Sequence, residues 1–215
     1  MKKIFIVGGG GYALECHFFL SEIIKRDKEI KFGGFLGQGG YGDKITSDLY
    51  KKYYLGDVSN FDFQENDYCI IGAGLPTARK IVAEELKKKQ AKFYNLILSL
   101  NDIPFPENIE LGEGNIIINS SFTVGIKIGD FNVFNGQVII GHGTSIGNYN
   151  FFAPRVQLLG NTKIGNENQI GANTILLPET KIGDNNKIAP LSAIYKGCKN
   201  NCYMLGNPAL KIGNI

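Results

Sequence analysis

In the second half of the chain, a large apolar residue recurs at every sixth position. Fourteen successive positions of this spacing hold Ile, Leu or Phe: Ile116, Phe122, Ile128, Phe134, Ile140, Ile146, Phe152, Leu158, Ile164, Ile170, Leu176, Ile182, Ile188 and Ile194. A period of six fits neither an α-helix nor a simple alternating strand. It is typical of a hexapeptide β-helix, in which each hexad is a short strand plus a corner and three hexads make one coil.

The position after each large apolar residue is usually small. These small residues are Gly129, Gly141, Gly147, Ala153, Gly165, Gly171, Gly183 and Ala189. We expect the large residue to point inward and the small one to fit a tight corner. One coil cannot bury its own core, so the coils must stack. No insertion is expected to interrupt the stack between residues 116 and 194.

The first half has a different pattern, in which apolar strands alternate with amphipathic helices. Strands are predicted at 2–7, 31–37, 67–71 and 92–98, and helices at about 12–26 and 76–90, the second opening with Pro76. This alternation indicates a small parallel α/β domain of the Rossmann-like kind. A proline-bearing segment at 101–110 separates the two patterns. We therefore predict an α/β domain over 1–105 and a β-helix domain over 106–215.

Charge and composition exclude several classes of function. The formal net charge is +3, with no basic block of the kind that follows a phosphate backbone, so nucleic acid is not an expected partner. No apolar run approaches a membrane span, and the apolar run at the start is too short for a secretory signal. The expected location is cytoplasmic. Two histidines and no Cys/His cluster predict no metal site.

Four cysteines occur without a CxxC spacing, so reduced, structural thiols are the simple interpretation, and a Cys198–Cys202 disulfide stays an open alternative. His17, within the first predicted helix, is expected in packing or at the surface.

Two glycine loops follow predicted strands and are candidate binding loops. In the first, Gly8, Gly10 and Ala13 fit a GxGxxG/A pattern, with Gly11 and Tyr12 between them. Its backbone N–H groups and the following helix N-terminus suit a pyrophosphate. No acidic residue ends the second predicted strand, so a nucleotide diphosphate is favoured over NAD. The alternative is a loop that serves only strand–helix packing.

The second glycine loop contains Gly72, Ala73 and Gly74, and Arg79 lies a few residues further on. Ligands gather at the carboxyl edge of parallel strands, where both loops are expected. Arg79 is a candidate for contacting a phosphate. A solvated helix residue is the alternative for Arg79.

The combination of a glycine-loop α/β domain, hexapeptide repeats and a His-containing corner resembles a known family. The segments that carry the resemblance are IFIVGGGGYALE near the start, IGHGTSIG and FFAPRVQLLGNTKIGNENQIGANTILLPETKIG in the repeats, and LGNPALK near the end. Together they cover nearly the whole chain. They resemble the NeuD/PglD-type bacterial sugar O-/N-acetyltransferases of the left-handed β-helix acyltransferase superfamily.

This resemblance implies a left-handed parallel β-helix, a homotrimer and an active site between subunits. It implies that the first domain holds a nucleotide-linked amino sugar and that acetyl-CoA lies along the β-helix. His142 matches the family's general base, and a neutral imidazole suits that role. The alternative for His142 is a solvated corner residue. Residues that the resemblance assigns to acetyl-CoA are Phe151, Gly160, Ala172, Gly206, Asn207, Pro208 and Lys211.

The chain departs from the family pattern at three places. Gly143 stands where some members have an acid that orients the histidine, and Phe151 stands where some have a second histidine. Gln38 stands near the position of an Asp that contacts the nucleotide base in several relatives, and its amide is the candidate substitute.

The expected function is acetyl-CoA-dependent N-acetylation of a nucleotide-linked amino sugar, an NDP-4-amino-4,6-dideoxyhexose, for surface glycan biosynthesis such as that of lipopolysaccharide. Two alternatives stay open: O-acetylation of a sugar such as sialic acid, and a non-catalytic trimeric scaffold that binds a nucleotide sugar.

Overall fold

The computed structural model describes residues 1–39 and 47–215, which form two compact units, Met1–Leu98 and Ser99–Ile215. No helix within the described residues has the length and apolar character to cross a membrane. The functional division predicted at 105/106 stays a prediction.

In the first unit, the described residues form a parallel five-stranded sheet with the order β3-β2-β1-β4-β5. The bounds are β1 (Lys2–Val7), α1 (Gly11–Arg26), β2 (Ile30–Gly37), α2 (Asp48–Tyr53), β3 (Tyr54–Asp57), the 3-10 turn η2 (Val58–Asn60), β4 (Asp67–Ile71), α3 (Pro76–Lys88), β5 (Lys92–Phe93) and β6 (Leu96–Ile97). The segment expected to be one closing strand is divided into β5 and β6. The sequence analysis did not predict α2 or β3.

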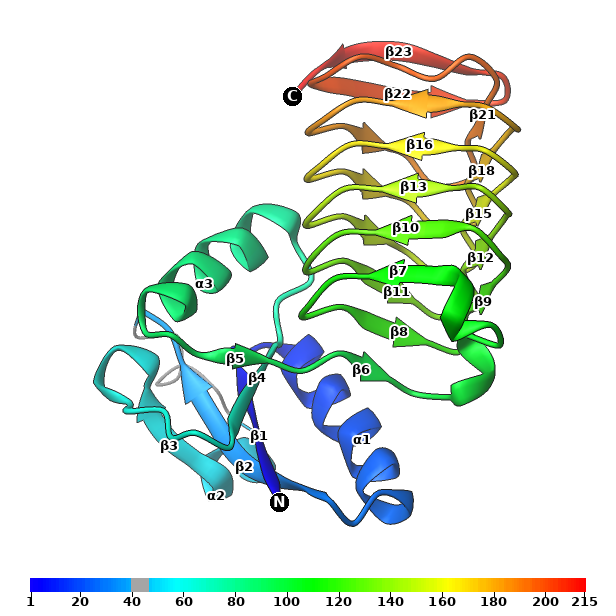
Figure 1. Cartoon of the computed structure of the whole chain (residues 1–215). Coiled ribbons are helices and arrows are strands. Elements are labelled where there is room, and N and C mark those ends of the chain that lie inside the picture. The colour runs from blue at the N-terminus through cyan, green and yellow to red at the C-terminus, as the bar shows by residue number, and fades with distance from the viewer. Residues whose placement is uncertain (40–46) are drawn as a thin grey trace. The chain divides into compact units, whose positions relative to one another are not determined.

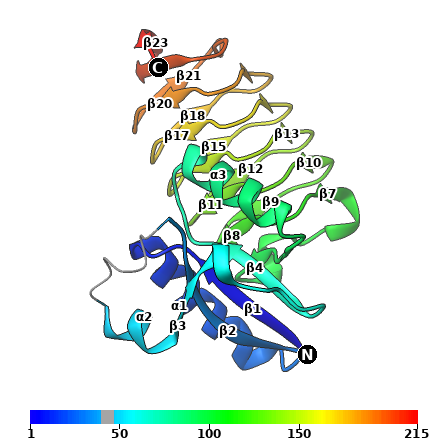
Figure 2. The same ribbon diagram turned by 90° about the vertical axis from the view of Figure 1, so that its left-hand side faces the viewer.

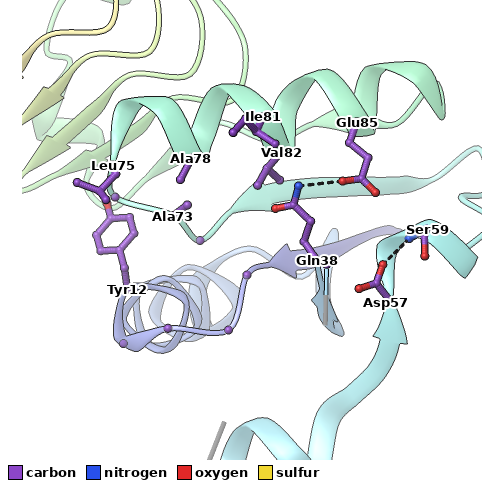
Figure 3. A pocket seen from close by; sticks show the side chains of 17 residues that line it. Tyr12, Gln38, Asp57, Ser59, Ala73, Leu75, Ala78, Ile81, Val82 and Glu85 are labelled. Carbon is purple, nitrogen blue, oxygen red and sulfur yellow. Dashed lines mark hydrogen bonds between the residues drawn. The ribbon is translucent and has the colours of Figure 1, made fainter. Parts of the chain in front are cut away.

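The strand order reverses direction at β1. The connection through α1 leads from β1 to β2, and the connection through α3 leads from β4 to β5 on the other side. Because such crossovers are right-handed, the two helices cover opposite faces of the sheet, as Figure 3 shows. A crevice therefore opens between the carboxyl ends of β1 and β4, which is where open α/β sheets bind ligands.

The second unit is a stack of short parallel strands that fits a left-handed β-helix (Figures 1 and 2). One sheet has the order β19-β16-β13-β10-β7, another has β21-β18-β15-β12-β9, and the third contains β23-β22-β20-β17-β14-β11-β8. The bounds are η3 (Leu100–Asp102), η4 (Pro106–Asn108), β7 (Ile109–Leu111), β8 (Ile116–Ile118), β9 (Ser121–Phe122), β10 (Ile126–Ile128), β11 (Val133–Asn135), β12 (Ile139–Ile140), β13 (Ser145–Ile146), β14 (Phe151–Phe152), β15 (Gln157–Leu158), β16 (Lys163–Ile164), β17 (Gln169–Ile170), β18 (Ile175–Leu176), β19 (Lys181–Ile182), β20 (Lys187–Ile188), β21 (Ala193–Ile194), β22 (Cys202–Gly206) and β23 (Ala209–Asn214).

The predicted inward positions are confirmed, because all fourteen residues of the six-residue series are at most 4 % exposed. The register differs in the first coil. Strand pairing aligns Phe134 with Ile117 rather than Ile116, whereas Ile140 aligns with Phe122 at the full spacing of 18. The corner between β8 and β9 is therefore one residue shorter than predicted. Ile116 is still buried, because it pairs with the buried Val133.

The small residues of the repeat have a different role from the one predicted. A Cβ on Gly141 would lie 2.7 Å from the backbone nitrogen of Gly160 in the next coil, so the constraint is coil-to-coil distance. The left-handed backbone conformation occurs two positions later, at Gly143 (φ +67) and at Asn161 (φ 59). Asparagine tolerates this conformation better than most residues, which explains why many corners need no glycine.

A ladder of buried asparagines runs along one edge of the stack. Asn132, Asn150, Asn168 and Asn186 are each at most 1 % exposed. Asn150 Nδ2 donates to Asn132 Oδ1 at 2.9 Å, and Asn168 Nδ2 donates to Asn150 Oδ1 at 3.0 Å. Each side chain also accepts from the backbone N–H of the next asparagine. The ladder satisfies buried polar groups between coils and fixes their register.

Candidate functional site

The first unit contains a cavity of about 1040 Å³ at the carboxyl edge of its sheet (Figure 3). Both predicted glycine loops line it. The predicted residues that line it are Gly8, Gly10, Gly11, Tyr12, Gln38, Gly72, Ala73 and Gly74. Residues of α3 form the opposite wall. The structure thus brings together eight of the nine residues predicted to bind the nucleotide sugar.

The glycines of the two loops have different physical roles. Gly8 has φ +133 and faces Gly72, whose carbonyl oxygen would lie 3.0 Å from a Cβ on Gly8. Gly72 in turn leaves room for Ala13, so these two glycines serve close packing. At Gly10 and Gly11 a Cβ would meet nothing within 4 Å. Packing does not explain those two glycines, whereas bare backbone beside a ligand does.

The N-terminus of α1 begins in the same loop. Gly10 is the N-cap residue and offers no side-chain hydrogen bond to the first turn. The first N–H groups of a 16-residue helix therefore lack a side-chain cap where the helix borders the cavity. Such a terminus favours a negatively charged group such as a phosphate.

Arg79 lies outside the cavity lining, contrary to its expected contact with a phosphate. Its side chain is fully buried, and Nη1 donates to the carbonyl oxygens of Ile71 at 2.7 Å and Ala73 at 3.0 Å. Arg79 therefore ties α3 to the end of β4 and to the second glycine loop. Tyr12 is half-buried beside the cavity, and burial raises the pKa of its hydroxyl well above 10.

Several cavity residues were missed by the sequence analysis. They are Gly9, Gly39, Asp57, Ser59, Leu75, Ala78, Ile81, Val82 and Glu85. Leu75, Ala78, Val82 and Glu85 follow the spacing of one helix face, and Leu75 and Ile81 are apolar yet more than half exposed. That exposed apolar face was the available signal. Asp57 supplies, at the end of β3, the acid that was sought at the end of the second strand.

His142 lies on an exposed corner of the second unit, directly after β12 and Gly141. Its ring covers Gly160 of the next coil, where a Cβ would lie 2.6 Å from Nε2 and 2.7 Å from Cε1. The His142 carbonyl accepts from the N–H of Asn161 at 2.8 Å. Within the described chain no side chain hydrogen-bonds the imidazole, so its place is set by this corner and by Gly160. The prediction of a corner position that points outward is confirmed.

The other residues predicted to bind acetyl-CoA are dispersed over the β-helix. Phe151 is half-buried on β14, and Ala172 follows β17 at a different corner from His142. Gly206, Asn207 and Pro208 lie at the β22–β23 hairpin, and Lys211 is exposed on β23. Of this set, only Gly160 is in contact with the His142 ring. Their binding role stays a prediction.

His17 is confirmed as a packing residue. Its ring lies 4.5 Å from that of Phe32 and 5.5 Å from that of Phe35, and burial lowers its pKa from 6.5. All four cysteines are free thiols in the structure. No group of three or more metal-binding side chains occurs in the described chain.

Comparison with known proteins identifies the repeat and the fold. Residues 161–196 match the family model described as bacterial transferase hexapeptide (six repeats). No curated protein sequence matches the chain significantly. The chain carries the hexapeptide repeat of bacterial transferases.

Solved structures with the same fold are acetyltransferases over their full length. A histidine-to-asparagine mutant of perosamine N-acetyltransferase from Caulobacter crescentus, in complex with CoA and GDP-perosamine, has a TM-score of 0.86 at 17% identity, with 100% of this chain and 98% of that chain covered. WeeI from Acinetobacter baumannii AYE has 0.82 at 20% identity, covering 99% and 100%. The acetyltransferase domain of PglB from Neisseria gonorrhoeae FA1090, in complex with acetyl coenzyme A, has 0.81 at 18% identity, covering 98% and 99%.

Proposed function

We propose that this protein is an acyltransferase that transfers the acetyl group of acetyl-CoA to the amino group of a nucleotide-linked amino sugar. The observation that carries the proposal is the pairing of two features in one chain. One is a cavity with bare glycine backbone at the carboxyl edge of a Rossmann-like sheet, and the other is an exposed histidine on a transferase hexapeptide β-helix. The full-length fold likeness to acetyltransferases with bound CoA supports it.

In this proposal, the nucleotide sugar binds in the cavity of the first unit. Its phosphates lie over Gly10 and Gly11 and accept hydrogen bonds from the first turn of α1. The packing glycines and Arg79 hold the two loops in place and make no contact with the ligand. The apolar residues of α3 cover the nucleoside.

His142 acts as the general base. The amine nitrogen attacks the thioester carbonyl carbon, a C–N bond forms, and the imidazole takes the proton that the nitrogen loses. The C–S bond then breaks, and CoA leaves as the thiol after it receives that proton. The exposed ring on an uncrowded corner suits this role, because a substrate can approach it without displacing protein atoms.

The active site is proposed to form between chains of a homotrimer. His142 and Ala172 lie at different corners of the prism, and Phe151 lies on the face of a third element, β14. Residues on different edges of one prism converge only where two prisms pack side by side. Both acetyl-CoA and nucleotide sugars are cytoplasmic substrates, and the proposed product serves surface glycan biosynthesis.

The test is CoA release by the purified protein with acetyl-CoA and a panel of nucleotide-linked 4-amino sugars. His142→Asn keeps a hydrogen-bonding side chain of similar size but no base. We expect its kcat to fall by about 100-fold or more, the scale of a lost general base. Lys181→Ala, an exposed change on β19, is the control and should keep full activity. Turnover only with hydroxyl acceptors would replace the proposal by O-acetylation, and no turnover or CoA binding would leave a nucleotide-sugar scaffold.

A further inference from the structure

One end of the cavity in the first unit is acidic. Gln38 follows β2, Glu85 lies on α3, and Asp57 ends β3; all three line the cavity and lie near one another in Figure 3. Gln38 Nε2 donates to Glu85 Oε2 at 2.8 Å. None of the described residues that line the cavity is a lysine, arginine or histidine. This end therefore presents carboxylate charge that no neighbouring cation in the lining offsets.

The Gln38–Glu85 contact fixes which way the amide points. An ionised carboxylate only accepts hydrogen bonds, so the nitrogen of the amide must face Glu85 and its oxygen must face away. Within the described chain this is the one hydrogen bond that either side chain makes. Gln38 Oε1 and the Glu85 carboxylate consequently remain available as acceptors. Asp57 is committed differently, because its Oδ1 accepts from the Ser59 N–H and caps η2.

The order of the sheet gives the cavity a direction. The phosphate-binding N–H groups follow β1, and the acceptors follow β2 and β3, one and two strands away. Neighbouring strands are ~4.8 Å apart, so the two ends are separated by roughly 5–10 Å, the reach of a nucleoside from its phosphate to its base. Ala78 and Val82 of α3 line the cavity between them. A nucleotide therefore lies along the strand ends with its base at the acidic end.

The chemistry of that end distinguishes between bases. Guanine carries two neighbouring donors, N1–H and the N2 amino group, which one carboxylate or two adjacent acceptors can receive. Uracil and thymine have a single N3–H between two carbonyl oxygens, and those oxygens would face Glu85 and Gln38. Adenine has one amino group beside a ring nitrogen that also accepts. A wall of acceptors thus fits guanine best.

We propose that this protein selects guanine nucleotides, with Glu85 and Gln38 receiving the donors of the base. The inference rests on the proposed function, since it takes the cavity to be the nucleotide-sugar site. It assigns to Glu85 a role in specificity, and it makes a GDP-linked sugar the substrate class.

The test is calorimetric binding of GDP, IDP, UDP, dTDP and ADP to the full chain. IDP differs from GDP by the missing N2 amino group, so it isolates the contact in question. We expect GDP to bind tightest and IDP at least tenfold more weakly, because a hydrogen bond to a charged group is lost. In Glu85→Gln the GDP-to-IDP ratio should fall toward one. Glu84→Gln, an exposed neighbour on α3 outside the cavity lining, should keep the wild-type ratio.

Tightest binding of UDP, dTDP or ADP would overturn the guanine assignment while leaving the proposed function intact. An unchanged GDP-to-IDP ratio in a folded Glu85→Gln protein would remove Glu85 from base recognition. If none of the five diphosphates binds, the cavity is not a nucleotide site, and the proposed function fails together with this inference. Thermal unfolding of each variant shows whether the fold is intact.

Discussion

Gly160 provides a direct test of whether His142 acts from the position that the structure gives it. Alanine is compatible with the backbone at Gly160, but its methyl carbon would lie 2.6 Å from Nε2 of His142 and 2.7 Å from Cε1. Ordinary contacts begin near 3.4 Å, so the imidazole must move by roughly 1 Å. A displacement of that size can cost about 100-fold in rate, and we expect kcat for Gly160→Ala to fall by that factor.

The measurement is steady-state CoA release together with thermal unfolding. Because alanine keeps the backbone N–H, the KM for acetyl-CoA should change little even if that N–H contacts CoA. Stability should also be nearly unchanged, since the exposed imidazole can move into solvent. A loss confined to kcat in a stable protein therefore points to the position of the ring.

The double variant His142→Ala/Gly160→Ala separates displacement of the ring from any other effect. Without the imidazole, the new methyl group has nothing to displace, so the second substitution should add less than about twofold to the loss. Full activity of Gly160→Ala alone would refute the idea that the base acts from this place. An equal loss in the His142→Ala background would show that Gly160 acts by some route other than His142.

Three further predictions concern stability. Burial lowers the pKa of His17 from 6.5, so the unfolded state binds more protons below that pH; the free energy of unfolding should be full above about pH 6.5 and fall below it, and His17→Phe should weaken this fall in denaturant titrations at pH 7 and 5. Asn150→Ala breaks the ladder in its middle and leaves buried polar groups unpaired, which should lower the free energy of unfolding by about 3 kcal/mol, whereas Asn101→Ala at an exposed site should change it by less than about 0.5 kcal/mol. Arg79→Met keeps volume but removes the donors to two buried carbonyl groups; a loss of about 3 kcal/mol is expected in thermal unfolding, against almost none for the exposed Lys88→Met.

The repeat was predictable because its cause is local and recurs. Each inward residue must be large and apolar, and each position after it must be small, so fourteen layers repeat one message. The slip in the first coil was not predictable, since Ile116, Ile117 and Ile118 are identical and any of them could point inward. Only pairing with β11 selects Ile117.

The two sites differ in the same way. His142 was found from sequence because an exposed histidine beside glycines stands out in a repetitive pattern. Glu85 and Asp57 were missed because the cavity is assembled from strand ends and a helix face that lie far apart in the chain. Arg79 was misjudged for a related reason: a sequence shows a charge near a loop, but not whether its donors meet a ligand or two carbonyl groups of the loop itself.

The asparagine ladder has a consequence for the length of the molecule. Because each asparagine bonds the one 18 residues away, the stack can gain or lose only whole coils without breaking the ladder. The axial distance between His142 and the β22–β23 hairpin therefore changes only in steps of ~4.8 Å. The prism is a ruler with fixed graduations. Excision of one 18-residue coil between those two points would bring Lys211 one graduation nearer the histidine and should shift the acyl-donor preference toward a carrier with a shorter pantetheine arm.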